Sequence, residues 1–236
     1  DSRTLPNFSR VDGSLMCAYM QRVGLEYVVN PDFDVSDLDK VYLDKARRLI
    51  TCKLLKNISG FKYSLSGQMA LSENDRSKVS KKLNSMKQRE LKGVPLENII
   101  VTCVKRMWFK NDKSHSDLKG TGKRAKAGPF AERTGLFKGV NWLPNTTRGT
   151  NDYDHCSHVI YLYDQYTSPA VGYWLNMRGE WAKRYALSEA IQLIWRSRIR
   201  DQEDKPITVY FGSKRMYGLF TEWLREGSEN EDVLED

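Results

Sequence analysis

Residues 98–104 read NIIVTCV, a run of β-branched and apolar residues with the length of a single strand. The run shows no alternation of apolar and polar residues, which is typical of a strand covered on both faces. Two further runs share this character, SHVIYLY at residues 157–163 and PITVYF at residues 206–211. Because helical patterns separate these strands, we predict an α/β domain with a mostly parallel sheet over residues 96–226.

Helical patterns also fill much of the preceding sequence. Residues 39–58 place apolar residues at near-helical spacing beside a face rich in lysine and arginine, and residues 77–92 form a second basic helical pattern. Ser213 is a suitable N-cap for a last helix. We therefore expect a mixed, mainly helical and basic region over residues 1–95, and an acidic disordered tail over residues 227–236 after the α/β domain.

Composition and charge limit the classes of function. The 236 residues are 40% hydrophobic and carry a net charge of +8, although residues 226–236 contain six acids and no base. The excess of positive charge in the rest of the chain favours DNA or RNA as a partner, and a solvated basic surface is the simpler alternative. No apolar run reaches the length of about 18 residues that a membrane span needs. Four cysteines without a CxxC pair indicate reduced thiols in a cytosolic protein.

Two segments resemble nucleotide-binding motifs only superficially. Residues 120–123 read GTGK, but a phosphate-binding loop needs glycine where Asp117 stands and serine or threonine where Arg124 stands. Asp164 follows the strand at residues 157–163 like a Walker B acid, yet no Walker A accompanies it. We therefore expect no complete ATP site within these residues.

The three histidines do not favour a metal-dependent nuclease. His115, His155 and His158 lack the spacing of metal ligands. We expect His155 to lie in a loop and His158 at the start of a strand, and we predict no metal site.

A polar segment at residues 146–151 reads TTRGTN and follows a short predicted strand at residues 136–142. Glycine at position 149 allows a close approach of the backbone to a ligand, and Arg148 adds positive charge. These features suit a bound phosphate, and a polar turn is the alternative interpretation.

Residues 185–200 read YALSEAIQLIWRSRIR, an amphipathic helical pattern with three arginines at its end. A helical wheel puts Gln192 and Arg196 opposite the apolar face, whereas Arg198 would project from the middle of that face. We therefore expect the helix to end or distort near Arg196. The arginines released there suit a phosphate, because the planar guanidinium binds its oxygens bidentately. A solvated basic face remains the alternative.

The order of these segments resembles the second RecA-like domain of a superfamily two helicase, and best a divergent, phage-type branch of DEAD-box-like enzymes. IIVTCVK at residues 99–105 is similar to motif four, LFKGVNWLPNTTRGTND at residues 136–152 to motif five, and QLIWRSRIR at residues 192–200 to motif six. The strand at residues 157–163 and the last strand and helix follow the same order.

The likeness has departures from the family pattern. Trp195 stands where the family usually has glycine, and Asn151 where many members have aspartate. Ile199 occupies the position of the second motif-six arginine, so either Arg198 or Arg200 must replace it.

The resemblance implies a RecA-like three-layer fold and a division of labour. ATP and Mg²⁺ are held mainly by a first RecA-like domain outside these residues, in cis or in trans, and the second domain supplies arginine fingers. The implied catalytic residues are Arg196, Arg200, Arg198 and Gln192. The implied nucleotide contacts are Gly149 and Asn151. The implied nucleic-acid contacts are Lys105, Arg106, Arg148 and Thr150.

These roles imply half of an ATP-dependent helicase or translocase, inactive alone and acting in phage replication in the host cytoplasm. The alternative is a catalytically inactive module that binds nucleic acid or a protein partner and keeps a RecA-like fold.

Overall fold

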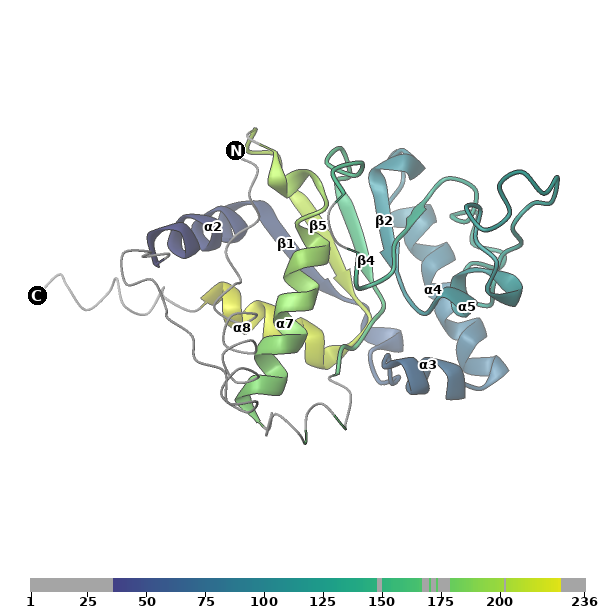
Figure 1. Cartoon of the computed structure of the whole chain (residues 1–236), viewed down its shortest axis with the longest axis horizontal. Coiled ribbons are helices and arrows are strands. Elements are labelled where there is room, and N and C mark those ends of the chain that lie inside the picture. The colour runs from purple at the N-terminus through teal and green to yellow at the C-terminus, as the bar shows by residue number, and fades with distance from the viewer. Residues whose placement is uncertain are drawn as a thin grey trace, which may run out of the picture.

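The structure is a computed structural model and describes residues 36–147, 150–166, 170, 173, 179–201 and 203–225. Its elements are arranged around one sheet (Figure 1). In chain order they are α2 (Ser36–Leu49), β1 (Ile50–Leu54), η1 (Lys56–Ile58), α3 (Leu65–Ala70), α4 (Glu73–Arg89), η2 (Leu96–Asn98), β2 (Ile99–Thr102), α5 (Lys105–Trp108), η3 (Lys110–Asp112), β3 (Asn141–Trp142), β4 (His158–Tyr161), α7 (Glu180–Ile194), η4 (Arg198–Arg200), β5 (Ile207–Phe211) and α8 (Lys214–Arg225).

The five strands form a sheet in the order β1-β5-β4-β2-β3, and every pair is parallel. The three strands predicted from apolar runs are confirmed as β2, β4 and β5. All four residues of β2 are buried, as expected for a strand that is covered on both faces. The strand expected at residues 136–142 is reduced to the two residues of β3.

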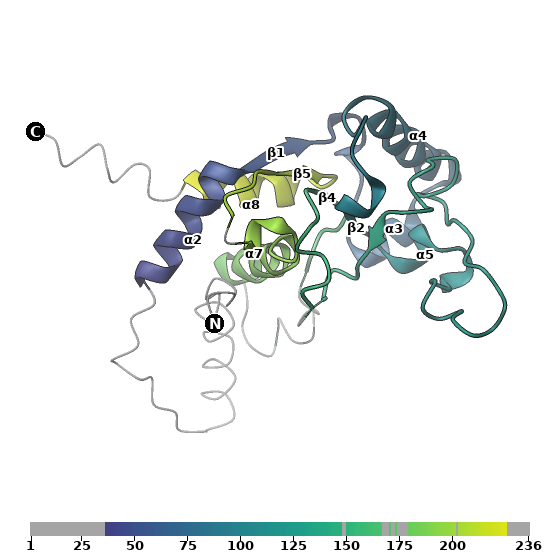
Figure 2. The same cartoon turned by 90° about the horizontal axis from the view of Figure 1, so that it is seen from above.

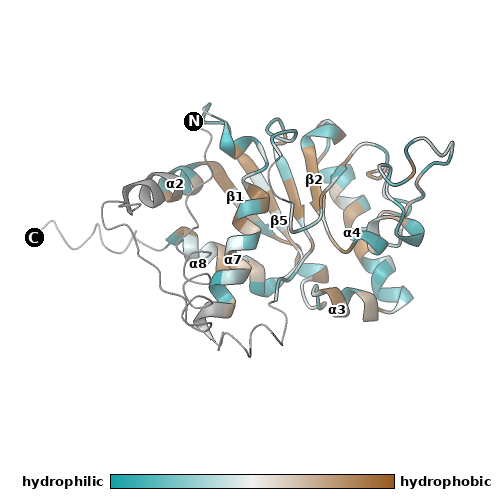
Figure 3. Ribbon diagram, in the orientation of Figure 1, coloured by the Kyte–Doolittle hydropathy of each residue, from teal (hydrophilic) through white to brown (hydrophobic). Residues whose placement is uncertain are grey.

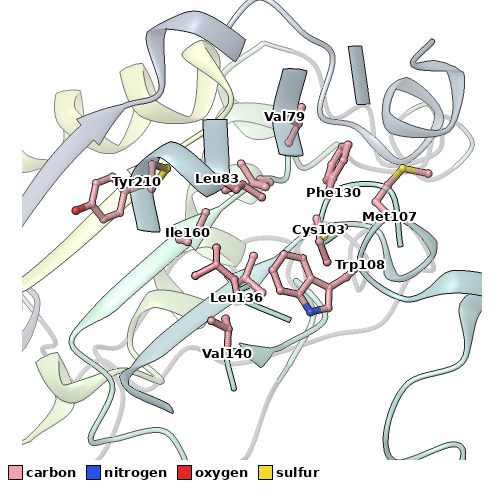
Figure 4. Close-up of a cluster of buried hydrophobic side chains, with 14 of the residues drawn as sticks. Val79, Leu83, Cys103, Met107, Trp108, Phe130, Leu136, Val140, Ile160 and Tyr210 are labelled. Carbon is pink, nitrogen blue, oxygen red and sulfur yellow. The ribbon is translucent and has the colours of Figure 1, made fainter. Parts of the chain in front are cut away.

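Helices cover both faces of the sheet, so the fold is a three-layer α/β arrangement (Figure 2). Ile99 and Val101 of β2 pack with α4 and α5 on one face, whereas Ile100 packs with α2, α7 and α8 on the other. The strands are mostly brown, the colour of apolar residues, whereas the helices around them carry both apolar and polar colours (Figure 3). Figure 4 shows the first of these clusters, in which Trp108 and Phe130 lie beside residues of α4 and the sheet.

The prediction of a helix over residues 39–58 is wrong for the second half of that range. The helix α2 ends at Leu49, and β1 follows at once as an edge strand paired with β5. The apolar residues of ITCKL fit a helical period when they are read with their neighbours, but pairing with β5 decides the conformation. The sheet therefore includes residues on both sides of the boundary expected between residues 95 and 96.

The helix predicted at residues 77–92 is confirmed as α4, although it begins earlier. Ser72 caps it by accepting a hydrogen bond from the Asp75 amide at 3.1 Å. Ser213 caps α8 in the predicted way, since its hydroxyl accepts from the Met216 amide at 3.2 Å. The expected tail at residues 227–236 lies outside the described residues.

The structure also bears on membrane spans and on the cysteines. No helix in the described part of the chain is long and apolar enough to cross a bilayer. Cys52, Cys103 and Cys156 are free thiols.

Candidate arginine site and basic loop

The end of α7 lies at the edge of the sheet where the parallel strands begin. The helix ends at Ile194, and Arg198–Arg200 form the short turn η4. The Arg198 amide donates to the Cys156 carbonyl at 3.0 Å, two residues before β4. The predicted break near Arg196 is therefore confirmed, and the contact with Cys156 fixes the direction of the chain after it.

The structure brings two predicted segments together at this amino edge of the sheet. Nη1 of Arg196 donates to the Thr150 carbonyl at 3.2 Å, and Nη1 of Arg200 donates to Oδ1 of Asn151. The two pairs join residues that lie 46 and 49 positions apart in the sequence. Arg196, Arg200, Thr150 and Asn151 are called the arginine site below. Arg148 and Gly149, predicted for the same segment, lie outside the described residues.

The two arginines of the arginine site differ in exposure. Arg196 is only 3% exposed, whereas Arg200 is partly exposed. A buried guanidinium that bonds a backbone carbonyl holds the loop to the end of the helix, whereas a partly exposed one lies where a ligand can reach it from the surface. Arg200 is therefore better placed to touch a phosphate, and Arg196 is better placed to position Thr150.

The face of α7 that the wheel put opposite the core is buried as well. Glu189, Gln192 and Arg196 are 2%, 9% and 3% exposed. The segment before β4 covers this face, because Thr150 bonds Arg196 and Cys156 belongs to the same buried cluster as α7. Gln192 lies inside this packing, where Nε2 donates to the Ser188 hydroxyl at 3.2 Å.

Arg198 has a different partner from its neighbours. Its Nε donates to the Pro206 carbonyl at 2.9 Å, and Nη2 bonds the same oxygen. This contact joins η4 to the segment that leads into β5. The structure thus pairs Arg200, and not Arg198, with Asn151.

The positive charge of this edge acts on His158, the first residue of β4. Burial lowers the pKa of its imidazole below the ordinary value, and the nearby charges of Arg198 and Lys53 lower it further. The ring stacks on Tyr210, with centroids 6.3 Å apart, and Nδ1 lies 2.8 Å from the Ser157 hydroxyl. His155 lies apart from it in an exposed turn, as predicted, with Nε2 at 3.1 Å from the Glu97 carbonyl oxygen.

A pH titration checks the electrostatics of this edge. Because the folded-state pKa of His158 lies below the unfolded value of about 6.5, the unfolded chain binds more protons in the interval between the two. We therefore expect the free energy of unfolding to decrease as the pH falls from 6.5 through the folded-state pKa of His158. Nuclear magnetic resonance should report that pKa, and Arg198→Met should raise it. A pKa at or above the ordinary value, or no change in Arg198→Met, contradicts this account.

Lys105 and Arg106 lie at the opposite edge, after the carboxyl end of β2. Nζ of Lys105 pairs with the Asp117 carboxylate at 2.8 Å, whereas Arg106 is exposed. The residues predicted to bind nucleic acid therefore do not form one patch, since Thr150 lies in the arginine site.

The carboxyl edge also holds Asp164, the acid that resembles part of a Walker B motif. Its carboxylate accepts from Nη1 of Arg215 at 2.6 Å and from the Tyr166 hydroxyl at 3.2 Å. The Arg215 guanidinium lies over the Tyr166 ring, 4.4 Å from its centroid. Asp164 is thus used in an internal ion pair, as expected for a loop acid after a strand.

Between β2 and β4 the carboxyl edge is closed by Gln68 of α3, which is completely buried. Its Nε2 donates to the carbonyls of Tyr63 and Leu162 at 2.8 and 2.9 Å, and Oε1 accepts from the Val104 amide at 3.1 Å. The connections after β4 and β2 run in opposite directions along the sheet. Open α/β sheets usually bind ligands at such a switch point. Here the glutamine fills that position.

The segment GTGK at residues 120–123 lies in a projecting loop whose turns continue without a helix. A phosphate-binding loop requires a strand before it and a helix after it, so this segment is not one. In the part of the chain that the structure describes, no three His, Cys, Asp or Glu side chains are grouped as a metal site requires.

Three residues of this geometry were missed from the sequence. Gln68 lies between the two predicted helices, outside every predicted element, and its partners Leu162 and Val104 are distant in sequence. Arg215 lies in the predicted last helix and has no role in the sequence-based prediction, although its position after the β5 strand is where side chains meet those after β4. Asp117 was considered only as a departure from a glycine motif.

Residues 44–224 match the family model of the YonV C-terminal Rossmann-like domain. The chain belongs to this family. A segment of 92 residues is 36% identical to the SPbeta prophage-derived uncharacterized protein YonV of Bacillus subtilis (strain 168) and covers 38% of this chain. It spans only 22% of that protein, and no solved structure matches the chain. The matched domain includes β1, so the family unit extends across residues 95 and 96.

Proposed function

We propose that this domain is the second motor domain of an ATP-dependent nucleic-acid helicase or translocase. The observation that carries the proposal is the arginine site, in which Arg200 is held by Asn151 and Arg196 holds the neighbouring Thr150 carbonyl. Arginines that are positioned by fixed polar groups suit the stabilisation of charge on a phosphoryl group. The net charge of +8 is suitable for a nucleic-acid partner.

In the proposed arrangement the nucleotide is bound mainly by a first RecA-like domain. The guanidinium chemistry of Arg200 fits a phosphate, whereas the described residues contain no carboxylate cluster that fits Mg²⁺. ATP bound with Mg²⁺ supplies the phosphoanhydride bond that is cleaved. Arg200 donates hydrogen bonds to the phosphate, Asn151 orients Arg200, and Arg196 fixes the loop that carries Asn151. Gln68 and Arg215 occupy the carboxyl edge, which favours a nucleotide contributed from outside this sheet.

The proposal is tested by separating the two halves of the motor. The 236-residue chain alone is expected to bind nucleic acid with a steep dependence on salt and to show no ATP turnover. Addition of the first domain, in cis or in trans, should produce turnover and make nucleic-acid affinity depend on ATP. ATP turnover by the 236-residue chain that is lost in Arg196→Ala would contradict the division of labour. If the affinity for nucleic acid does not change with ATP even when the first domain is present, the inactive binding module is favoured.

A further inference from the structure

The loop between α5 and β3 extends away from the body of the domain in both views (Figures 1 and 2). Residues 110–126 are called the basic loop. They contain two aspartates and six basic residues, and all six bases are exposed. The bases are Lys110, Lys113, Lys119, Lys123, Arg124 and Lys126. No salt bridge joins any of the six to another residue that the structure describes.

The neck of the basic loop is closed by defined contacts. Phe109 and Ala127 form an antiparallel bridge, and the Lys110 amide donates to the Lys126 carbonyl at 2.8 Å. The Phe109 ring packs edge-on against Phe137 and Trp142, with centroids 5.6 and 5.4 Å apart. The loop is therefore attached to the apolar core at its base.

The ion pair between Asp117 and Lys105 of α5, called the latch below, neutralises one of the two acids of the basic loop. The Asp117 carboxylate accepts from Nζ of Lys105 at 2.8 Å, from the Ser114 amide at 2.7 Å and from the Ser114 hydroxyl at 2.5 Å. The contact with Lys105 and, to a smaller extent, those with Ser114 hold the pKa of Asp117 well below its ordinary value. Asp117 is thus paired with Lys105 and Ser114, and it does not neutralise the six exposed bases.

The tip of the basic loop is built by glycines that no other residue replaces without strain. Gly120 and Gly122 have φ of 80° and 69°, in the left-handed region. The Thr121 amide and hydroxyl both bond the Leu118 carbonyl, at 3.1 and 2.8 Å. The GTGK segment therefore forms a tight turn that presents Lys119, Lys123 and Arg124 from one short stretch.

We propose that the basic loop grips the phosphodiester backbone of a nucleic acid. Six unpaired cations in one fixed loop repel one another, and a closely spaced row of phosphates offsets that repulsion. Contacts of this kind hold the strand without reading its sequence. Lys105, expected from sequence to touch nucleic acid, instead positions the loop through Asp117, and Arg106 extends the basic surface at its base. The choice of partner rests on the proposed function.

The test compares two triple variants of the whole chain in a binding assay without nucleotide. One is Lys119→Gln, Lys123→Gln and Arg124→Gln. The control removes the same charge from exposed lysines elsewhere, as Lys56→Gln, Lys92→Gln and Lys214→Gln. Fluorescence anisotropy is measured with labelled single-stranded DNA and single-stranded RNA of one mixed sequence, over a series of salt concentrations.

The loop variant is expected to lose about tenfold or more in affinity at low salt, with a salt slope shallower by about 2. The control is expected to keep its slope nearly unchanged. A loss on DNA or RNA supports the proposal, and a loss on only one identifies the polymer. Equal losses in the two variants, or no loss in the loop variant, overturn it. Because no nucleotide is present, this result is independent of whether Arg200 acts on ATP.

A second variant distinguishes the effect of the latch on nucleic-acid affinity from the effect of net charge. Asp117→Asn makes the chain more positive, so charge alone predicts tighter binding. If the latch orients the loop, Asp117→Asn instead binds more weakly, and trypsin cleaves more rapidly after Lys119 or Lys123. Tighter binding with unchanged cleavage would overturn the role of Lys105 and Asp117 in positioning the loop.

Discussion

Under the proposed function, replacing Arg200 with alanine is expected to reduce nucleic-acid-stimulated ATP turnover about 1,000-fold in a protein or complex that contains both proposed motor domains, because an arginine finger typically contributes at least that much. The structural reason is the pairing of Arg200 with Asn151 at a partly exposed position of the arginine site. The effect should appear in kcat rather than KM, since the proposed role of the guanidinium is to stabilise charge that develops during phosphoryl transfer. Steady-state turnover at saturating nucleic acid measures it.

The matched control for Arg200 is Arg198, two residues away in the same turn. Arg198→Ala removes the contact with the Pro206 carbonyl and leaves Asn151 and Arg200 in place, so turnover should change little. Arg200→Lys keeps the charge but loses the planar fork, and an intermediate loss is expected. A larger loss in Arg198→Ala than in Arg200→Ala would contradict the assignment of Arg200. Unfolding midpoints of the variants show whether each remains folded.

The strands could be predicted where the sequence carries a continuous apolar run. β2, β4 and β5 are central strands buried on both faces, and burial on two faces leaves a signal that needs no knowledge of the partner strand. β1 lies at the edge and carries no such signal, because only its pairing with β5 selects a strand over continuation of α2.

The break of α7 could be predicted, but its environment could not. Arg198 in an apolar face indicates that a regular helix cannot continue. The burial of Gln192 and Arg196 depends on the segment before β4, which packs over the face that the wheel assigns to solvent. Local periodicity contains no information about a covering loop, so the distinction between a buried Arg196 and a partly exposed Arg200 requires the tertiary structure.

Gln68→Leu is expected to lower the free energy of unfolding by about 3–5 kcal/mol, a large share of a typical total of about 5–15 kcal/mol. The side chain makes three hydrogen bonds, of which two join the segment after β1 to the ends of β4 and β2. Leucine fills a similar volume but leaves the Val104 amide and the Leu162 carbonyl without the partner that Gln68 supplies, whereas the Tyr63 carbonyl still accepts from the Asp164 amide at 3.0 Å. Each buried group left unsatisfied costs about 1–3 kcal/mol. Urea unfolding followed by tryptophan fluorescence measures the loss.

The same substitution at an exposed glutamine supplies the control. Gln88→Leu on α4 changes the same atoms in solvent, and its effect should stay within about 0.5 kcal/mol. Gln68→Glu keeps an acceptor for Val104 but places a carboxyl group in a buried site, which raises its folded-state pKa. Its protonated form donates to one carbonyl, so this variant should be more stable, relative to the unmodified chain, at acidic than at neutral pH. Equal losses in Gln68→Leu and Gln88→Leu would mean that the three bonds do not hold the carboxyl edge together. The occupied switch point would then no longer argue for a nucleotide contributed from another domain.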